Sequence, residues 1–400
     1  MAKRTKKIGF LSVLLTILIS LAIGATGGAA AKIFLFTETY VIPEKQAAET
    51  SVAIGSLDVD VVKNEELSIH FIELGNKYTG DCTLIKAGDV EILIDAGSRT
   101  NSIQPIYNYV SRYVEGDLDF VIVTHAHQDH YAGFSTSENV DSLFDLFTVR
   151  TIIQFSKTNQ TTGKMYQNYL TQIEQEKAKG TEVYTSLQCY DNNSIGNALT
   201  TGEVGPHRSY NLSANVSLNI LYHEFYEENA ASENDYSVCC MINQQNENYY
   251  LFTGDLEEDG EESLVNQYKL DYGVAEQQVA LYKAGHHGSK TSSSTTLLSF
   301  FKPKVVCVCC CAGSSEYTSK VENQFPTQQF IDRIAPYTDK VFVTTLCLDY
   351  NKGSYQSFNG NIIVYANSNK QVNVACANNN IVLKNTDWFK TNRTCPDAWK

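Results

Sequence analysis

The residues best suited to metal chemistry lie in one short segment, 124–130, whose sequence is THAHQDH. It holds three of the chain's eight histidines, together with an aspartate. Because alternate side chains of an extended segment point the same way, His125 and His127 are expected to aim at one point. A turn after His127 would bring Asp129 and His130 toward an adjacent point. Imidazole and carboxylate are ligands of borderline divalent metals, so we predict one or two divalent ions here, zinc or manganese.

Three further segments place polar residues at the end of an apolar run. Asp95 follows ILI, Asp255 follows LFTG, and the pair His286 and His287 follows VALYKAG. Each alone has an ordinary explanation, since turn carboxylates and structural histidines are common. In combination they predict that several strands deliver ligands to one edge of a layered fold, because sites gather where strands end.

The elements that must position these residues are short apolar runs, many of them bounded by glycine, asparagine or aspartate. Such runs are typical of strands, and helical patterns fall between them, so we predict a layered α/β fold. The polar stretch 185–215 is expected to be a surface insertion. Predicted strands are 68–74, 82–87, 90–94, 119–123, 217–222, 238–243, 249–253, 279–284, 304–311, 340–346, 361–366 and 371–376. Predicted helices are 103–114, 163–178, 258–269, 294–302 and 326–335, the last with Pro326 in its first turn.

The N-terminus is basic and then apolar. Lys3, Arg4, Lys6 and Lys7 precede 8–31, which carries no charged residue. This pattern is typical of a signal peptide or a membrane anchor, and the two alternatives stay open for residues 1–31. Both place the rest of the chain outside the cytoplasm, secreted or membrane-anchored. Residues 32–65 show little periodicity and are interpreted as a stalk.

Charge and cysteine content narrow the function classes. The 400-residue chain has 31 Lys and Arg against 45 Asp and Glu, a net charge of −14. A surface of that sign repels phosphate backbones, so extended DNA binding is not expected. Of the eleven cysteines, four lie at 307–311 in a predicted buried strand, where thiols act as small apolar side chains. The one disulfide candidate is Cys376 with Cys395.

Taken together, these motifs resemble the metallo-β-lactamase fold, and most closely the extracytoplasmic hydrolase domain of ComEC-type competence proteins. The resemblance covers about residues 67–366. It implies two mixed β-sheets flanked by helices, an αββα sandwich, with a dinuclear metal site at one edge. The domain is expected to span 66–368, followed by a tail, 369–400. The resembling segments are ILIDAG, THAHQDH, ENDYS, LFTGD and AGHHGSKTSS.

The resemblance also implies roles for the individual residues. His125 and His127 would bind the first metal, which lacks a third histidine, with His223 or Asn234 as possible donors. The second metal would be bound by Asp129, His130 and His286. Asp255 would bridge the two ions and Asp95 would brace the site. Asp129 is also a candidate to orient the nucleophile, and His287 to donate to the substrate oxyanion or to be structural. Where the family often has His-Pro, this chain has Phe325-Pro326.

The function expected from these residues is metal-dependent hydrolysis. Two divalent ions about 4 Å apart lower the pKa of a shared water and stabilise charge on a phosphoryl oxygen. A phosphodiesterase acting on a small-molecule or polymer substrate is the leading hypothesis. An ester or lactone hydrolase of the same fold is the first alternative. The second is a non-catalytic surface module stabilised by metal. The membrane would be a partner if the N-terminal segment is not cleaved.

Overall fold

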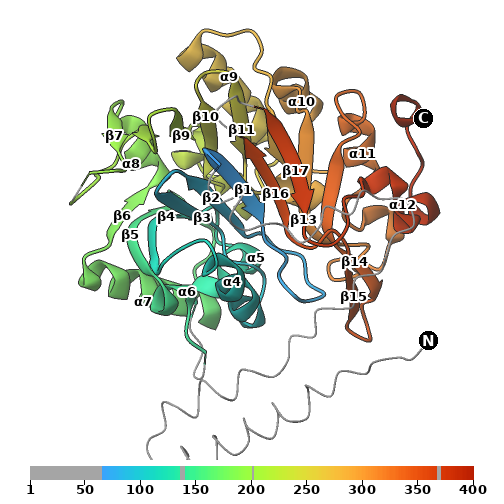
Figure 1. The fold of residues 1–400 in the computed structure, drawn as a ribbon, viewed down its shortest axis with the longest axis horizontal. Helices are drawn as coiled ribbons and strands as arrows, with labels where there is room; N and C mark the ends of the chain where they lie inside the picture. The colour runs from blue at the N-terminus through green and yellow to red at the C-terminus, as the bar shows by residue number, and fades with distance from the viewer. Residues whose placement is uncertain (1–64, 136–139, 201, 367–370) are drawn as a thin grey trace, which may run out of the picture. The chain divides into compact units, whose positions relative to one another are not determined.

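The computed structural model describes residues 65–135, 140–200, 202–366 and 371–400. In this part of the chain, two mixed β-sheets pack face to face, with helices on their outer sides (Figure 1). The predicted fold class is confirmed. The predicted signal peptide or anchor (1–31) and the stalk (32–65) lie outside the described residues, apart from Glu65. Among the described residues, no helix has the length and apolar character needed to cross a bilayer.

The first sheet has the order β17-β16-β1-β2-β3-β4-β5-β6. Its strands pair antiparallel from β17 to β3 and parallel from β3 to β6. The strands are β1 (Leu67–Phe71), β2 (Thr83–Ala87), β3 (Val90–Ile94), β4 (Asp117–Val123), β5 (Thr148–Gln154), β6 (Glu182–Thr185), β16 (Ile362–Ala366) and β17 (Val372–Cys376).

The second sheet has the order β15-β14-β13-β12-β11-β10-β9-β8-β7. Its centre, β11 to β14, is parallel. The strands are β7 (Ile195–Asn197), β8 (Ser209–Asn211), β9 (Val216–Leu221), β10 (Cys239–Gln244), β11 (Asn248–Phe252), β12 (Leu281–Lys283), β13 (Val305–Ala312), β14 (Val341–Asp349) and β15 (Ser354–Ser357).

The side chains of β13 alternate between the core shared by the two sheets and the core under the outer helices. Cys307 and Cys309 pack into the core shared with the first sheet, whereas Val306, Val308 and Cys310 pack with helices of the outer layer. Successive strand residues face opposite ways, so every residue of this apolar strand is buried. The cysteine-rich run is therefore a core strand, as predicted, and all eleven cysteines, Cys376 and Cys395 included, are free thiols.

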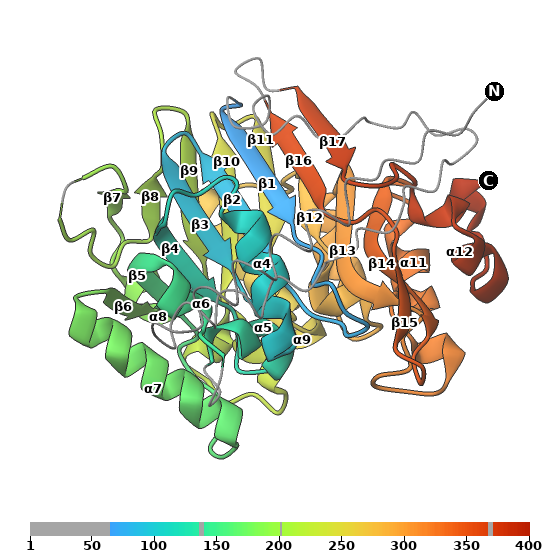
Figure 2. The same ribbon diagram turned by 60° about the horizontal axis from the view of Figure 1, so that its bottom comes forward.

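Helices cover both sheets, as Figure 2 shows. On the side of the first sheet, α4 and α7 contribute apolar residues to the core, and α9, α10 and α11 do so on the side of the second. The α-helices are α4 (Ile103–Val110), α5 (Gln128–Tyr131), α6 (Leu143–Leu146), α7 (Lys164–Lys179), α8 (Ser186–Asp191), α9 (Glu258–Tyr272), α10 (Thr295–Phe301), α11 (Gln328–Ile334) and α12 (Asp387–Asn392).

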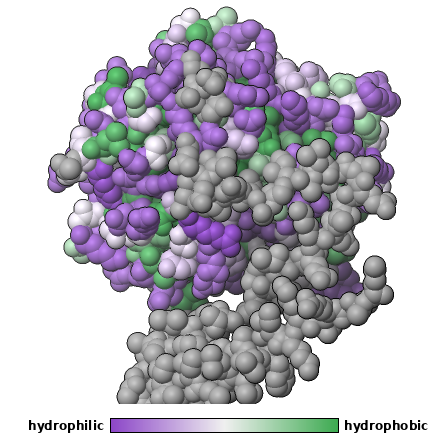
Figure 3. Space-filling view, viewed as in Figure 1, coloured by the Kyte–Doolittle hydropathy of each residue, from purple (hydrophilic) through white to green (hydrophobic). Residues whose placement is uncertain are grey.

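Several segments differ from the sequence-based expectation, and β5, β6 and β15 were not among the predicted strands. Pro326 precedes α11 instead of starting it, because Thr327 caps the helix through its side chain. The expected insertion contains α8 and adds β7 and β8 to the edge of the second sheet. The expected tail continues the fold, since β17 pairs with β16 and Trp399 is buried in the second core. On the face drawn in Figure 3, the uncovered surface is largely hydrophilic with scattered apolar residues.

Candidate metal centre

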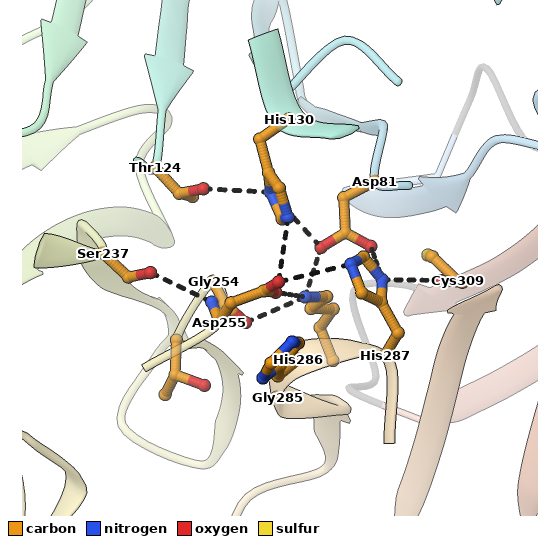
Figure 4. Close-up of polar contacts among 12 residues, drawn as sticks. Asp81, Thr124, His130, Ser237, Gly254, Asp255, Gly285, His286, His287 and Cys309 are labelled. Carbon is orange, nitrogen blue, oxygen red and sulfur yellow. Dashed lines mark hydrogen bonds and ion pairs between the residues drawn. The ribbon is translucent and has the colours of Figure 1, made fainter. Parts of the chain in front are cut away.

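The candidate site lies where strands of both sheets end. Asp95 follows β3 and the segment 125–130 follows β4, both in the first sheet, while Asp255 follows β11 and His287 follows β12 in the second. The carboxyl ends of parallel strands are the usual place for a site in layered α/β folds. Figure 4 shows the side chains from the two sheets turned toward one another.

The centre of the site is a convergence of ring nitrogens on carboxylate oxygens. His130 Nε2 lies 3.1 Å from Asp255 Oδ2. His287 Nε2 lies 3.2 Å from the same oxygen and 3.4 Å from Asp129 Oδ2. His130, His287 and Asp255 are almost completely buried. Two imidazoles and two carboxylates facing one point form a donor set that suits a divalent metal.

The Nδ1 atoms of His130 and His287 also have hydrogen-bond partners. His130 Nδ1 donates to Asp95 Oδ2 over 2.7 Å, and His287 Nδ1 donates to the carbonyl oxygen of Cys309 over 2.8 Å. Asp95 is itself fixed by the backbone N–H and the hydroxyl of Thr124. A carboxylate or carbonyl on Nδ1 orients a metal-binding imidazole and leaves Nε2 for the metal. The bracing contact expected of Asp95 is present.

Asp255 is placed by a tight turn. Gly254 has φ +54°, and a Cβ at that position would lie 2.8 Å from Ser237 Oγ. The same hydroxyl accepts a hydrogen bond from the backbone N–H of Asp255 over 3.0 Å. The glycine of the TGD motif is thus required by close approach and by its left-handed backbone.

The sequence-based reasoning missed Asp81, which lies just before β2. Its carboxylate contacts His287 Nδ1 at 3.3 Å and His130 Nδ1 at 3.8 Å. Asp81, His130, Asp255 and His287 all have ligand atoms within 4.8 Å of one another. Asp81 faces Nδ1 of both His130 and His287, so we assign it the role of orienting these rings. Asp129 lies on the Nε2 side, and we assign it to the candidate metal ligands. A Gly-Asp pair at the start of an apolar run was the available sequence feature.

Lys283, at the end of β12, was also missed. Its ammonium contacts Asp81 and lies 3.2 Å from Asp255 Oδ1 and 2.9 Å from the carbonyl oxygen of Gly254. The side chain is buried, so this charge is fixed inside the site. It neutralises part of the negative charge that Asp81, Asp95 and Asp255 concentrate there.

Charge pairing sets the protonation of the buried residues. Burial alone would lower the pKa of His130 and His287, but the neighbouring carboxylates, Asp255 foremost, raise both pKa values well above their usual range. Conversely, burial would raise the pKa of Asp255, and His130, His287 and Lys283 lower it well below its usual value. In the metal-free protein these imidazoles therefore carry a proton on the nitrogen that faces the carboxylates.

His125 and His127 form a separate pair. His125 Nε2 and His127 Nδ1 lie 3.0 Å apart, so both nitrogens face one point. Burial lowers the pKa of His125, and His127 is partly exposed. Of the possible extra donors, His223 gives its Nε2 proton to the carbonyl oxygen of Ser237, and Asn234 faces Glu257 and His286.

His286, predicted as a ligand of the second metal, does not join the buried cluster. Its Nδ1 lies 3.4 Å from a Glu257 oxygen and 3.1 Å from Thr291 Oγ1. His286 and His287 have φ values of +47° and +54°, and two left-handed residues in succession turn the adjacent side chains apart. His287 takes the inward position, so its Nε2 faces Asp255 and Asp129, where the sequence had suggested a hydrogen bond to substrate.

The donor set fits a divalent ion. His287 Nε2 is buried and makes no well-aligned hydrogen bond, although carboxylate oxygens lie 3.2 and 3.4 Å away. A buried ring nitrogen without an aligned partner is rare in native proteins, and a bound ion would supply that partner. Nitrogen and oxygen donors together suit zinc or manganese.

One family model matches part of the chain. Residues 75–136 match the family model described as the metallo-beta-lactamase superfamily. No curated protein matches the sequence. Among solved structures, the metal-dependent hydrolase Tm1679 of the beta-lactamase superfamily is 12% identical, with 72% of this chain and 98% of that chain covered and a TM-score of 0.36.

Two other structures are similar at the same level. The metallo-beta-lactamase fold protein YhfI from Bacillus subtilis is 14% identical, with 55% of this chain and 71% of that chain covered and a TM-score of 0.30. Human tRNase Z, short form, is 12% identical, with 69% and 91% covered and a TM-score of 0.30.

Proposed function

We propose that this chain, a hydrolase of the metallo-β-lactamase superfamily, is a metal-dependent phosphodiesterase that works outside the cytoplasm. The observation that carries the proposal is the buried convergence of His130 Nε2, His287 Nε2 and Asp255 Oδ2, next to Asp129. Within the superfamily, we propose a relation to ComEC-type extracytoplasmic domains, supported by the TGD and HHGS motifs.

The protein's own residues divide the work. His130, His287, Asp255 and Asp129 would hold a divalent ion, zinc or manganese, with His125 and His127 available to a second. When bound, such an ion lowers the pKa of water and polarises a phosphoryl oxygen. Asp95, Asp81 and the carbonyl oxygen of Cys309 orient the imidazoles, and Lys283 holds Asp255 in place.

Local charge favours an anionic substrate. Arg99 lies four residues after Asp95 and Lys77 four residues before Asp81, so the loops that carry two site carboxylates each also carry a cation. Both side chains are partly exposed, in a chain whose net charge is −14. Glu316 offsets part of the Arg99 charge, so these two cations mainly lessen the repulsion that an anion would meet at the site. This effect would not help a neutral lactone.

The test is an assay of the full chain, loaded with Zn²⁺ or Mn²⁺, against bis-p-nitrophenyl phosphate, an aliphatic lactone and a single-stranded oligonucleotide. We expect cleavage of the phosphodiester that is lost after chelation and restored by metal. Cleavage of the lactone alone would replace the proposal with the ester or lactone alternative. If the protein binds metal, gains thermal stability and cleaves nothing, it is the non-catalytic module.

We also propose that the chain is secreted or membrane-anchored, a proposal that rests on the basic and apolar pattern of residues 1–31. Mass spectrometry of the mature N-terminus distinguishes a cleaved signal from a retained anchor. Protease added to intact cells should digest the protein, and a chain that is protected until the cells are lysed would contradict this location. The net charge of −14 argues for short or surface-polymer substrates over extended DNA.

A further inference from the structure

Tyr317 combines an exposed ring with a hydroxyl inside the site. It lies in the loop between β13 and α11, and its residue surface is 56% exposed. The hydroxyl donates to Asp129 Oδ2 over 2.7 Å. That oxygen is the one that faces His287 Nε2 at 3.4 Å. The side chain therefore stands at the boundary between solvent and the candidate metal ligands, where a substrate has to enter.

The loop that carries Tyr317 is anchored on both sides. Glu316 accepts hydrogen bonds from Arg99 Nη2 and from the backbone N–H of Thr79, each over 2.9 Å. The Tyr317 ring packs 5.8 Å from the ring of Phe325. Phe325 in turn lies 5.9 Å from the ring of His287. Contacts to both sheets thus hold the hydroxyl in position before any substrate binds, which is the condition for useful transition-state stabilisation.

The other hydrogen-bond donors described for the site already have acceptors within the protein. Lys283 is buried and its ammonium contacts Asp81, Asp255 and the carbonyl oxygen of Gly254. The Nδ1 protons of His130 and His287 go to Asp95 and to the carbonyl oxygen of Cys309. Tyr317 also donates its single proton, to Asp129. It differs because a hydroxyl can rotate that proton from Asp129 toward a substrate, and because its own ring reaches solvent.

We propose that Tyr317 is a catalytic residue that donates a hydrogen bond to the leaving-group oxygen of a phosphodiester, an inference that rests on the proposed function. Water adds its oxygen to phosphorus, and the P–O bond to the leaving group breaks with its electron pair going to the leaving oxygen. The products are a phosphomonoester and an alcohol or phenol, and protons from the attacking water and solvent balance the two oxygens. Tyr317 keeps its own proton throughout and only stabilises the developing negative charge.

The experiment compares Tyr317→Phe with the wild-type chain on two diesters that differ only in the leaving group, methyl p-nitrophenyl phosphate and methyl phenyl phosphate. Phenolate is the poorer leaving group and gains more from a hydrogen bond. We expect kcat on the phenyl ester to fall by about 10²-fold, with a change on the nitrophenyl ester smaller by about tenfold. Metal content and Tm should stay as in the wild type.

Tyr78→Phe is the matched control. Tyr78 lies in the loop before Asp81, and its side chain makes its contacts through the ring, 4.3 Å from the Arg99 guanidinium. We expect this variant to retain wild-type rates on both esters. Its failure to do so would show that the loops tolerate no loss of a hydroxyl and would overturn the assignment to Tyr317.

The remaining outcomes separate the two proposals. If Tyr317→Phe slows both esters equally and also weakens metal binding, Tyr317 positions Asp129 and the inference is wrong. If neither rate changes, it is also wrong. If the metal-loaded wild type cleaves neither diester, the phosphodiesterase proposal itself fails, and the inference fails with it.

Discussion

The two halves of the candidate site differ in how firmly their ligand side chains are oriented and how deeply they are buried. In the half formed by His130, His287 and Asp255, every imidazole has its second nitrogen held by a carboxylate or carbonyl, and the donors are buried. In the other half, His125 and His127 face each other at 3.0 Å and His127 is partly exposed. Orientation before binding decides metal affinity. We therefore expect the buried half to bind an ion first and more tightly.

The largest effect should follow Asp255→Asn. The substitution removes the charge that both inward imidazoles and Lys283 face, so we expect the tight ion to be lost and phosphodiester cleavage to fall by about 10³-fold or more. Metal analysis and a rate measurement test this. Asp259→Asn, on the exposed side of α9, is the matched control. Wild-type metal content in Asp255→Asn would show that the two halves are not different.

The consecutive histidines provide the next contrast. His287→Ala should weaken the tight ion by more than about 100-fold, beyond the usual cost of losing an outer contact. His286→Ala should retain it, because the His286 ring faces Glu257 and Thr291. Competition titration with a chromophoric chelator measures both affinities. The reverse result would return His286 to the role that the sequence suggested.

Asp95→Asn tests the outer support of the buried half. An amide at this position can still accept a hydrogen bond from His130 Nδ1, but without the charge, so we expect metal affinity to fall by about 10- to 100-fold. The same titration applies, and the affinity of the His125 and His127 half should fall less, because Asp95 reaches His125 only through the Thr124 hydroxyl. An equal loss at both halves would mean that Asp95 acts through the fold as a whole.

The last contrast between the two halves concerns pH. The pKa values of His130 and His287 are raised by their carboxylate neighbours, so both are protonated near neutral pH. Metal needs the neutral ring. Binding at the buried half should therefore release up to two protons, and affinity should rise with pH by about tenfold per pH unit for each proton.

The other half should behave differently. The pKa of His125 is lowered, so that ring releases no proton when an ion binds. Calorimetry in two buffers of different ionisation enthalpy counts the protons released in each step. If protons were released only when an ion binds at the His125 and His127 half, the expected difference between the two halves would be wrong.

The sequence predicted the fold and most of the strands because alternation and strand-end motifs are local patterns. It located His130, Asp255 and Asp95 for the same reason. It chose His286 as the metal ligand, whereas the structure turns His287 toward the buried cluster, because the orientation depends on two left-handed residues that no local pattern requires.

Asp81 and Lys283 were missed for a different reason. Each resembles an ordinary residue at the end of a strand, and the two come together only because the two sheets pack face to face. The edge strands β7 and β8 were assigned to a surface insertion because their patterning is weak, whereas β17 was predicted as a strand but placed in a tail outside the domain. Their place is set by the neighbours with which they pair.

The donors of the buried half come from both sheets, His130 from the first and Asp255 and His287 from the second. An incompletely folded chain cannot present them together, so capture of the ion has to wait until the two layers have closed. Once bound, the ion ties one layer to the other and stabilises the closed form according to its free concentration. The lifetime of the protein in its compartment would then depend on the supply of metal there.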